Sequence, residues 1–257
     1  MLSFQLRKKV ERSIRIIREA KSRAGDLPLI VNFSGGKDSL VLLDLARQAV
    51  DDLVPFYTKT DIQFEESFEY ARSICQVFGY DLAYSTPDLY KGGFYQRLAH
   101  FKYFPTIKKR WCSRDLKFRP QKRKLTSMLG RHHFYKLNAV RRYESSRRRQ
   151  IYKSPVYFKP DYDVHGDIIV LPLLDWTDND IQSYLKIRDI PVNPLYKKYS
   201  ISGCYWCPFY QPHIYERILK QHPTLYDRII EWEVKLNQPS VIGYVWLRDL
   251  KEKIVGG

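Results

Sequence analysis

The sequence predicts an α/β protein with a doubly wound, mostly parallel sheet. Along most of its 257 residues, short apolar runs of strand character alternate with amphipathic segments of helical period. Strands separated by helices usually form a parallel sheet covered on both faces. Hydrophobic residues make up 44% of the chain, which is enough for a substantial core. No apolar run reaches the ~20 residues that cross a bilayer, so no membrane span is expected.

The first predicted element is an amphipathic helix within residues 1–28, where apolar residues recur at helical spacing. Its acids Glu11 and Glu19 argue against a cleaved targeting signal, and we expect a cytoplasmic protein. Strands are predicted at residues 27–33, 51–60, 80–87, 132–140 and 167–176, and helices at 38–50, 64–79 and 212–237. The pattern therefore predicts an N-terminal helix over 1–28, an α/β domain over 29–190, and a C-terminal extension over 191–257 that holds a C-x-x-C loop and helices.

The chain is strongly basic, with 44 lysines and arginines against 28 acids and a formal net charge of +16. Basic residues gather at 108–110, 121–124, 141–149 and 196–198, with tyrosines and histidines nearby. Such a charge attracts polyanions, and aromatic side chains among the basic ones suit stacking on bases. Nucleic-acid contact is one interpretation. A solvated surface, or a pocket for a small anion, is the other.

A glycine-containing loop, "SGGKDS", joins the first predicted strand to the following helix. It matches neither G-x-x-x-x-G-K-[ST] nor G-x-G-x-x-G, which excludes the two commonest nucleotide-binding motifs. Two glycines still allow backbone N–H groups to converge on an anion at a helix N-terminus. Lys37 and the loop hydroxyls add donors, whereas Asp38 would orient the loop or bind Mg²⁺. A tight turn without a ligand is the alternative.

Six segments in order resemble the adenine nucleotide alpha-hydrolase (PP-loop) superfamily, and more closely its phosphoadenosine phosphosulfate (PAPS) reductase family. The loop resembles the superfamily's pyrophosphate-binding loop. The other segments are "TDIQFEES" at 60–67, "WCSRDLKFRP" at 111–120, "AVRRYESSRR" at 139–148, "LPLLDWTDNDIQSYL" at 171–185 and "IPVNPLYKKYSISGCYWCPF" at 190–209. Each motif is weak alone, but together they span most of the chain.

The resemblance implies that the sheet holds an adenine nucleotide, ATP or a sulfonucleotide (APS or PAPS), at the carboxyl ends of its strands. The residues implied to bind it are Ser34, Gly35, Gly36, Lys37, Asp38, Ser39, Asp61, Arg141, Arg142 and Arg147. Lys37 and Asp38 are also implied in catalysis. Glu144 is expected to brace the arginines, and a solvated loop is the alternative for the arginines from Arg147 onward.

The four cysteines divide into two kinds. Cys75 lies in a helical pattern and is expected to be a buried apolar side chain. In the cluster-bearing branch of the family, a C-C pair and a C-x-x-C hold a 4Fe–4S cluster. In this chain Trp111 stands where the family has the first cysteine of the pair. Cys112, Cys204 and Cys207 are therefore the implied metal ligands and catalytic thiols. Zinc held with a histidine such as His213, and a metal-free redox pair, are the alternatives.

One departure from the family bears on the reaction. Sulfonucleotide reductases of the family carry a nucleophilic cysteine in a C-terminal tail, and this chain has none after Cys207. We expect an ATP-dependent sulfur transferase that acts on tRNA or DNA and receives sulfur from a donor such as a cysteine desulfurase. A sulfonucleotide reductase that uses an external thiol, and a non-catalytic nucleotide-binding subunit, are the alternatives. The sequence leaves the oligomeric state open.

Overall fold

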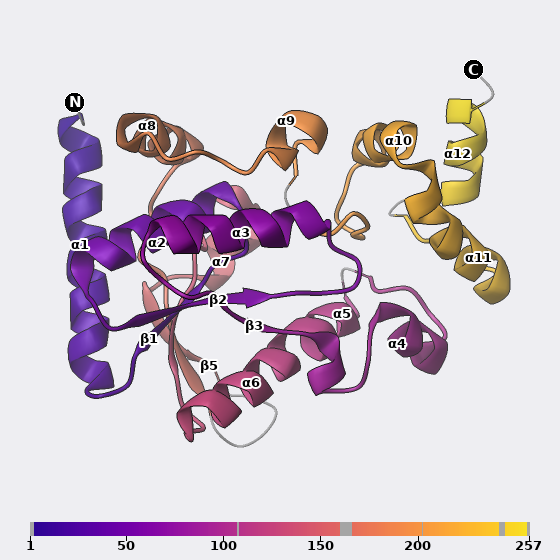
Figure 1. The fold of residues 1–257 in the computed structure, drawn as a ribbon. Coiled ribbons are helices and arrows are strands. Elements are labelled where there is room, and N and C mark those ends of the chain that lie inside the picture. The colour runs from indigo at the N-terminus through magenta and orange to yellow at the C-terminus, as the bar shows by residue number, and fades with distance from the viewer. Residues whose placement is uncertain (1–2, 107, 160–165, 202, 242–244, 256–257) are drawn as a thin grey trace. The chain divides into compact units, whose positions relative to one another are not determined.

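The computed structural model describes residues 3–106, 108–159, 166–201, 203–241 and 245–255 (Figure 1). The chain forms two compact units. The first consists of Met1–Tyr57, Phe68–Ala83 and Thr126–Asn193, and the second of Thr58–Ser67, Tyr84–Leu125 and Pro194–Gly257. The sequence pattern predicts one continuous domain over 29–190, whereas two segments from that range pack with the C-terminal residues in the second unit.

The predicted α/β fold is confirmed by a six-stranded sheet in the order β3-β2-β1-β4-β6-β5. Its strands are β1 (Leu29–Asn32), β2 (Leu53–Thr58), β3 (Ala83–Ser85), β4 (Tyr135–Leu137), β5 (Val156–Lys159) and β6 (Asp167–Val170). β1 runs parallel to β2 and β4, and β4 runs parallel to β6, with Ile30 opposite Val54 and Lys136. β5 pairs antiparallel with β6 and was not predicted.

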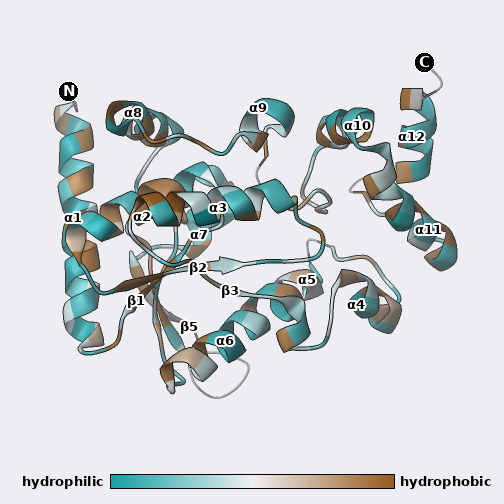
Figure 2. Ribbon diagram, in the orientation of Figure 1, coloured by the Kyte–Doolittle hydropathy of each residue, from teal (hydrophilic) through white to brown (hydrophobic). Residues whose placement is uncertain are grey.

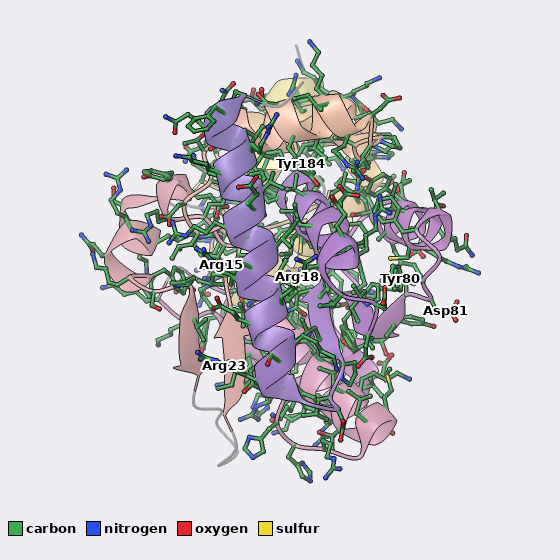
Figure 3. The ribbon with its side chains drawn as sticks, turned by 90° about the vertical axis from the view of Figure 1, so that its left-hand side faces the viewer. Arg15, Arg18, Arg23, Tyr80, Asp81 and Tyr184 are labelled. Atoms are coloured by element: carbon green, nitrogen blue, oxygen red, sulfur yellow. The ribbon has the colours of Figure 1, made fainter. Side chains whose placement is uncertain are left out.

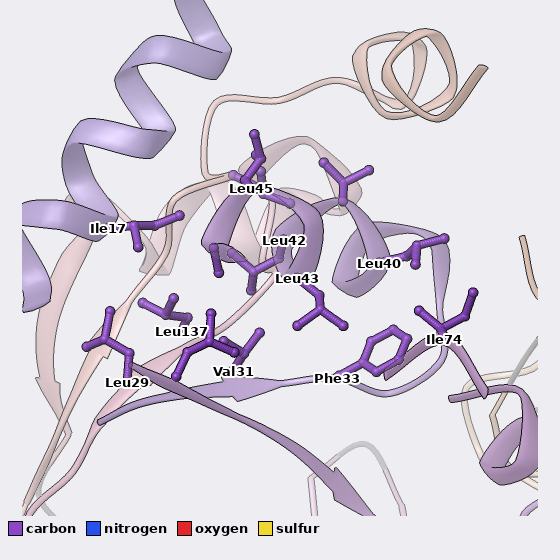
Figure 4. Close-up of a cluster of buried hydrophobic side chains, with 14 of the residues drawn as sticks. Ile17, Leu29, Val31, Phe33, Leu40, Leu42, Leu43, Leu45, Ile74 and Leu137 are labelled. Atoms are coloured by element: carbon purple, nitrogen blue, oxygen red, sulfur yellow. The ribbon is translucent and has the colours of Figure 1, made fainter. Parts of the chain in front are cut away.

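Helices α1 (Phe4–Ala24) and α2 (Lys37–Ala49) of the first unit contact strands of this sheet. The other helices of this unit are most of α3 (Glu65–Val77), the short η3 (Arg142–Glu144), α7 (Ser146–Ile151) and α8 (Asp178–Arg188). α2 contacts α1, β1 and α8, and every residue from Ser39 to Ala46 is buried. Figure 2 shows the hydrophobic stretch of α2, and Figure 4 shows its leucines packed over Val31 and Leu137. Because α2 is fixed by the core, the loop that precedes it is also held in place.

The second unit is mainly helical. It contains η1 (Pro87–Leu89), α4 (Phe94–Phe101), α5 (Trp111–Ser113), the π-helical η2 (Arg114–Phe118), most of α6 (Arg119–Leu129), α9 (Leu195–Tyr199), α10 (Pro212–Gln221), η4 (Pro223–Tyr226), α11 (Asp227–Leu236) and α12 (Leu247–Val255). Its core is aromatic, with Phe94 5.3 Å from the ring centroids of both Trp111 and Trp206. Among the described helices, none is long and apolar enough to cross a membrane.

The predicted helix over 212–237 is wrong in one respect, because the segment forms two helices rather than one. α10 ends at Gln221, and α11 begins at Asp227 after a 3₁₀ turn that starts with Pro223. Proline has no N–H to donate and restricts the residue before it, so the helix ends there.

Candidate nucleotide-binding and thiol sites

The SGGKDS loop connects β1 to α2 in the first unit. Gly35 has φ +72°, a left-handed conformation that favours glycine, and it reverses the chain just before α2. The Oγ of Ser39 accepts the N–H of Ser34 at 3.2 Å and donates to the carbonyl of Gly36 at 2.9 Å. The carbonyl of Gly35 accepts a hydrogen bond from Asn193 Nδ2 at 3.2 Å. The loop is therefore held by its own serines and by an amide from the end of the unit.

Two cations and two carboxylates meet beside this loop. Lys37 Nζ and Arg141 Nη2 each lie 3.0 Å from the same atom, Oδ1 of Asp178. Arg141 Nε lies 3.1 Å from Oδ1 of Asp38, and the Arg141 side chain is 3% exposed. The four formal charges cancel. Asp178 is the most open member of the group, with 61% of its side chain exposed.

The environment separates the two carboxylates. Burial raises the pKa of Asp38, and the nearby Arg141 and Lys37 charges only partly oppose that shift. The hydrogen bond from Lys37 lowers the pKa of Asp178. Asp178 is thus the stronger acid of the two, and it holds the Lys37 ammonium in place.

The guanidinium of Arg141 is incompletely paired. Among the described residues, its buried Nη1 makes no hydrogen bond, and its Nε contacts Oδ1 of Asp38 as an ion pair without hydrogen-bond geometry. Buried polar groups in proteins are normally satisfied, so each unpaired atom requires an explanation. The unpaired Nη1 of this planar guanidinium suits a phosphate oxygen, and the Asp38 carboxylate has the oxygen donors that Mg²⁺ bound to phosphates takes. Both groups fit the Mg²⁺–nucleotide that the sequence implies.

The other predicted nucleotide-binding residues lie in different surroundings. Arg142 Nε is 2.8 Å from Asp175 Oδ1, and Arg147 is exposed in the short helix α7. Glu144 accepts the N–H of Arg141 at 2.9 Å and pairs with Arg148. The structure therefore brings Arg141, and not Arg147, to the loop.

Asp61 belongs to the second unit. Both of its carboxylate oxygens accept the N–H of Phe94, at 3.0 and 2.8 Å, where α4 begins. Burial raises its pKa, and the hydrogen bond from Phe94 opposes that shift. A Cβ added at Gly93 would lie 2.4 Å from Oδ2 of Asp61, so this glycine lets the carboxylate reach the helix. The contacts of Asp61 are those of a residue that caps α4.

Three cysteines gather around a lysine in the second unit. Lys117 Nζ, in the π-helical turn after Cys112, lies 3.9 Å from Cys204 Sγ. The pKa of Lys117 is raised, first by the charge of Cys204 and also by those of Cys112 and Cys207. Burial raises the pKa of Cys207 to about 11. The three thiols therefore all lie close enough to Lys117 for their charges to affect its pKa.

Cys75 belongs to the first unit, where it is a buried apolar side chain as predicted. It is fully buried in the core of the first unit, against the same cluster as Phe68 and Ile74, and burial raises its pKa to about 12. An isolated thiol of this kind behaves as a small apolar side chain.

The thiol group does not have the arrangement of a single-ion site. Among the described residues, no three His, Cys, Asp or Glu side chains are placed to hold one metal ion, and His213 is exposed. Zinc–sulfur bonds of about 2.3 Å would bring the sulfurs to roughly 4 Å from one another. The ligand sulfurs of a 4Fe–4S cluster lie farther apart, at roughly 7 Å. Thiolates are donors to iron–sulfur clusters and to zinc alike, so the donor chemistry of these three cysteines fits a thiolate-bound metal centre.

The basic runs are distributed over both units. The run at 108–110 is exposed in the second unit, and the run at 141–149 belongs to the first. α1 adds exposed arginines to the first unit, and Figure 3 shows Arg15, Arg18 and Arg23 along the outer side of that helix. Both units therefore present exposed cations.

Two residues of these sites were missed by the sequence reasoning. Asp178 lies 141 positions from Lys37 in the chain, so no local pattern could link them. The signal available was an acid at the start of a helix within the "DWTDND" segment. Lys117 could have been noticed because it follows Cys112 by five residues in the same motif segment.

A profile of the phosphoadenosine phosphosulfate reductase domain matches residues 28–210. The chain belongs to the phosphoadenosine phosphosulfate reductase family. That range contains the loop, Arg141, Asp178 and the three clustered cysteines. Membership and fold support binding of an adenine nucleotide by this family domain.

Curated relatives of the chain carry several names. An uncharacterized protein of Methanocaldococcus jannaschii is 26% identical over 88% of this chain and 53% of its own length. Adenosine 5'-phosphosulfate reductase 2 of Bacillus subtilis is 23% identical, over 82% of this chain and 85% of the relative. Sulfate adenylyltransferase subunit 2 of Vibrio atlanticus is 30% identical, over 72% and 64%. The chain spans about half the length of the first two curated relatives that it matches, 53% and 44%.

Solved structures share the fold. PAPS reductase from Candida auris superimposes with a TM-score of 0.53 at 17% identity, covering 77% of this chain and 92% of that one. FMN adenylyltransferase from Candida glabrata gives a TM-score of 0.55 at 15% identity, covering 81% and 65%. At these identities the likeness concerns the fold alone.

Proposed function

We propose that this PAPS reductase-family protein is an ATP-dependent sulfur transferase that acts on nucleic acid. The observation that carries the nucleotide part is Arg141, a buried guanidinium beside the SGGKDS loop whose Nη1 has no hydrogen-bond partner among the described residues. Phosphate oxygens at the loop N–H groups would complete that pairing. The arrangement needs an anionic ligand, and a nucleotide is the ligand that the family supports.

The first half-reaction is adenylyl transfer. An oxygen of the acceptor attacks the α-phosphorus of ATP, the bond to the β-phosphate oxygen breaks, and pyrophosphate leaves. Lys37 and Arg141 would balance the charge that develops on the phosphate oxygens. Asp38 would help to hold Mg²⁺, which would supply further positive charge there. The relatives named sulfate adenylyltransferase subunit 2 carry an adenylyl-transfer reaction in their name, which supports this half.

The second half-reaction delivers sulfur. The terminal sulfur of a donor persulfide, such as that of a cysteine desulfurase, attacks the activated carbon of a tRNA base or the activated phosphorus of DNA, and AMP leaves with the oxygen. A second thiol, from this protein or from a thiol reductant, then attacks the donor cysteine in the resulting disulfide, which releases the thiolated acceptor and leaves a disulfide behind. Cys112, Cys204 and Cys207 would bind the iron–sulfur centre, with Lys117 beside them. Such a centre would supply a place to bind the sulfur that is transferred. The charged, exposed runs support a polyanionic acceptor, either tRNA or DNA.

A sulfonucleotide reductase is the second candidate. The relative named adenosine 5'-phosphosulfate reductase 2, which aligns over 82% of this chain, favours it. Attack on the sulfonucleotide requires a thiolate nucleophile. This chain has no cysteine after Cys207, so the thiol would come from Cys112, Cys204, Cys207 or another molecule. A non-catalytic role beside a partner subunit is the third candidate.

One assay separates these candidates. Labelled pyrophosphate exchange into ATP is measured with tRNA, with duplex DNA, with sulfate, and without acceptor, and APS reduction by dithiothreitol is measured in parallel. The proposal predicts exchange that depends on one nucleic acid, and binding of that polymer that weakens steeply with salt. The matched control is Gly36→Val, which should lose exchange while keeping its fold. APS reduction without nucleic-acid-dependent exchange would support the sulfonucleotide reductase instead. If the protein showed neither activity, the non-catalytic role beside a partner subunit would be favoured.

A further inference from the structure

We propose that Asp178 is an exchangeable counter-anion of the nucleotide site: its carboxylate occupies the place of a phosphate between Lys37 and Arg141 and is released when the nucleotide binds. This inference rests on the proposed function only in that the loop binds a nucleotide. It does not depend on the sulfur-transfer step.

The position of the carboxylate supports this role. One oxygen of Asp178 lies 3.0 Å from Lys37 Nζ and 3.0 Å from Arg141 Nη2. Lys37 is the first residue of α2 and Asp178 the first of α8, and these helices contact each other. Helix N-termini carry partial positive charge. The carboxylate thus lies where two cations and two helix dipoles all favour an anion.

The charge balance of the site favours such an exchange. Lys37 and Arg141 are neutralised by Asp38 and Asp178 in this structure. A nucleotide that adds several negative charges at the loop would repel both carboxylates. One of them has to move away, or cations must be added.

Exposure decides which carboxylate moves. The side chain of Asp178 is 61% exposed, whereas that of Asp38 is 21% exposed and lies against the buried Arg141. Asp178 can rotate into water, where its charge is fully solvated, whereas Asp38 would leave the buried Arg141 without its ion pair. Thr177 caps α8 through its own hydroxyl, which accepts the N–H of Asp180 at 3.2 Å, so the helix keeps its start when Asp178 turns outward.

The inference predicts that Asp178→Asn binds anions more tightly. Affinity for inorganic pyrophosphate and for ATP should rise about three- to tenfold. This is the range expected when the partly exposed Asp178 carboxylate no longer competes with the ligand for Lys37 and Arg141. The experiment is isothermal titration of the full chain with each probe, in EDTA and again in Mg²⁺. Glu69→Gln is the matched control, because it removes one exposed negative charge from α3 in the same unit. Asp178→Ser provides a second variant if the first one folds poorly.

Each outcome has a defined meaning. Tighter binding of both probes in EDTA by either Asp178 variant, with Glu69→Gln unchanged, supports the exchange. Unchanged or weaker binding would overturn it, because Asp178 would then be neutral or would position the two cations. Weaker binding only in Mg²⁺ would also overturn it and would make Asp178 a metal ligand. Wild-type protein that binds neither probe would overturn both the exchange and the nucleotide site. A failed sulfur-transfer assay with intact binding would overturn only the proposed function.

Discussion

Arg141 and Asp38 form an ion pair inside the first unit, with Arg141 Nε 3.1 Å from Asp38 Oδ1. The guanidinium is 3% exposed, so its charge depends on neighbouring anions rather than on water. Burial raises the pKa of Asp38, whose charge in turn depends on Arg141. The two residues therefore support one another, and removing either should affect both folding and ligand binding.

Arg141→Gln should destabilise the protein and abolish nucleotide binding. Loss of the cation leaves a largely buried carboxylate unpaired, which should cost about 2–3 kcal/mol of unfolding free energy. Urea denaturation and ATP titration measure the two effects. The double variant Asp38→Asn/Arg141→Gln should recover most of the stability but no binding. Stability lost equally in the single and double variants would contradict the pairing.

Gly35 and Gly36 should respond differently to alanine. Gly35 has φ +72°, so alanine there should cost about 1–2 kcal/mol of unfolding free energy. Gly36 has φ −86° and ψ 157°, which any residue adopts, so alanine should leave stability nearly unchanged. A side chain at Gly36 would still stand where the anion approaches, and ATP binding should weaken at least tenfold. Thermal melts and ATP titration test the pair, and normal ATP binding by folded Gly36→Ala would argue against the loop as the phosphate site.

The sequence predicted the elements whose signal is local. The apolar run before "SGGKDS" and the helical pattern after it correspond to β1 and α2 within a residue or two. β5 was missed because its four residues, Val156–Lys159, pair at the edge of the sheet and follow no extended alternation. The break at Pro223 had a visible cause, but the helical periodicity on both sides hid it.

The residues of the candidate sites also differ in whether a local sequence pattern could predict them. Glycine loops and C-x-x-C spacing are local, so their positions could be read from the chain. The partners of those residues could not, because Asp178 reaches Lys37 over 141 positions and Lys117 reaches Cys204 over 87. Such pairings are fixed by how strands and helices pack, and a single sequence gives no measure of that packing.

Iron content should follow the three clustered cysteines. Protein purified without oxygen should contain roughly four iron and four sulfide per chain and absorb near 400 nm, as a 4Fe–4S cluster requires. Cys112→Ser and Cys204→Ser should each lose most of the iron, and Cys75→Ser should retain it, because Cys75 lies in the core of the first unit. Zinc at one per chain, or iron that persists in Cys204→Ser, would rule out the assigned ligands.

Cys75 should make stability fall at alkaline pH. The pKa of this thiol is raised to about 12 in the folded protein, while an unfolded cysteine ionises near 8.5. Between these values the unfolded chain loses the proton first, so unfolding becomes more favourable as pH rises. From pH 8 to pH 10 wild type should lose about 2 kcal/mol more stability than Cys75→Ala. Urea denaturation of both proteins at the two pH values tests this, and parallel losses would contradict it.

The chain enters or leaves the second unit after Tyr57, Ser67, Ala83, Leu125 and Asn193, which has a consequence for its synthesis. Phe94 and Trp206 pack together there, yet a ribosome makes them about 110 residues apart. At about 5–20 residues per second, the earlier ring waits about 5–20 seconds for the later one. During that interval the aromatic residues of 84–125 have none of their C-terminal partners. A chaperone that shields nascent aromatic segments would therefore raise the yield of folded protein, and slow translation before residue 194 would lower it.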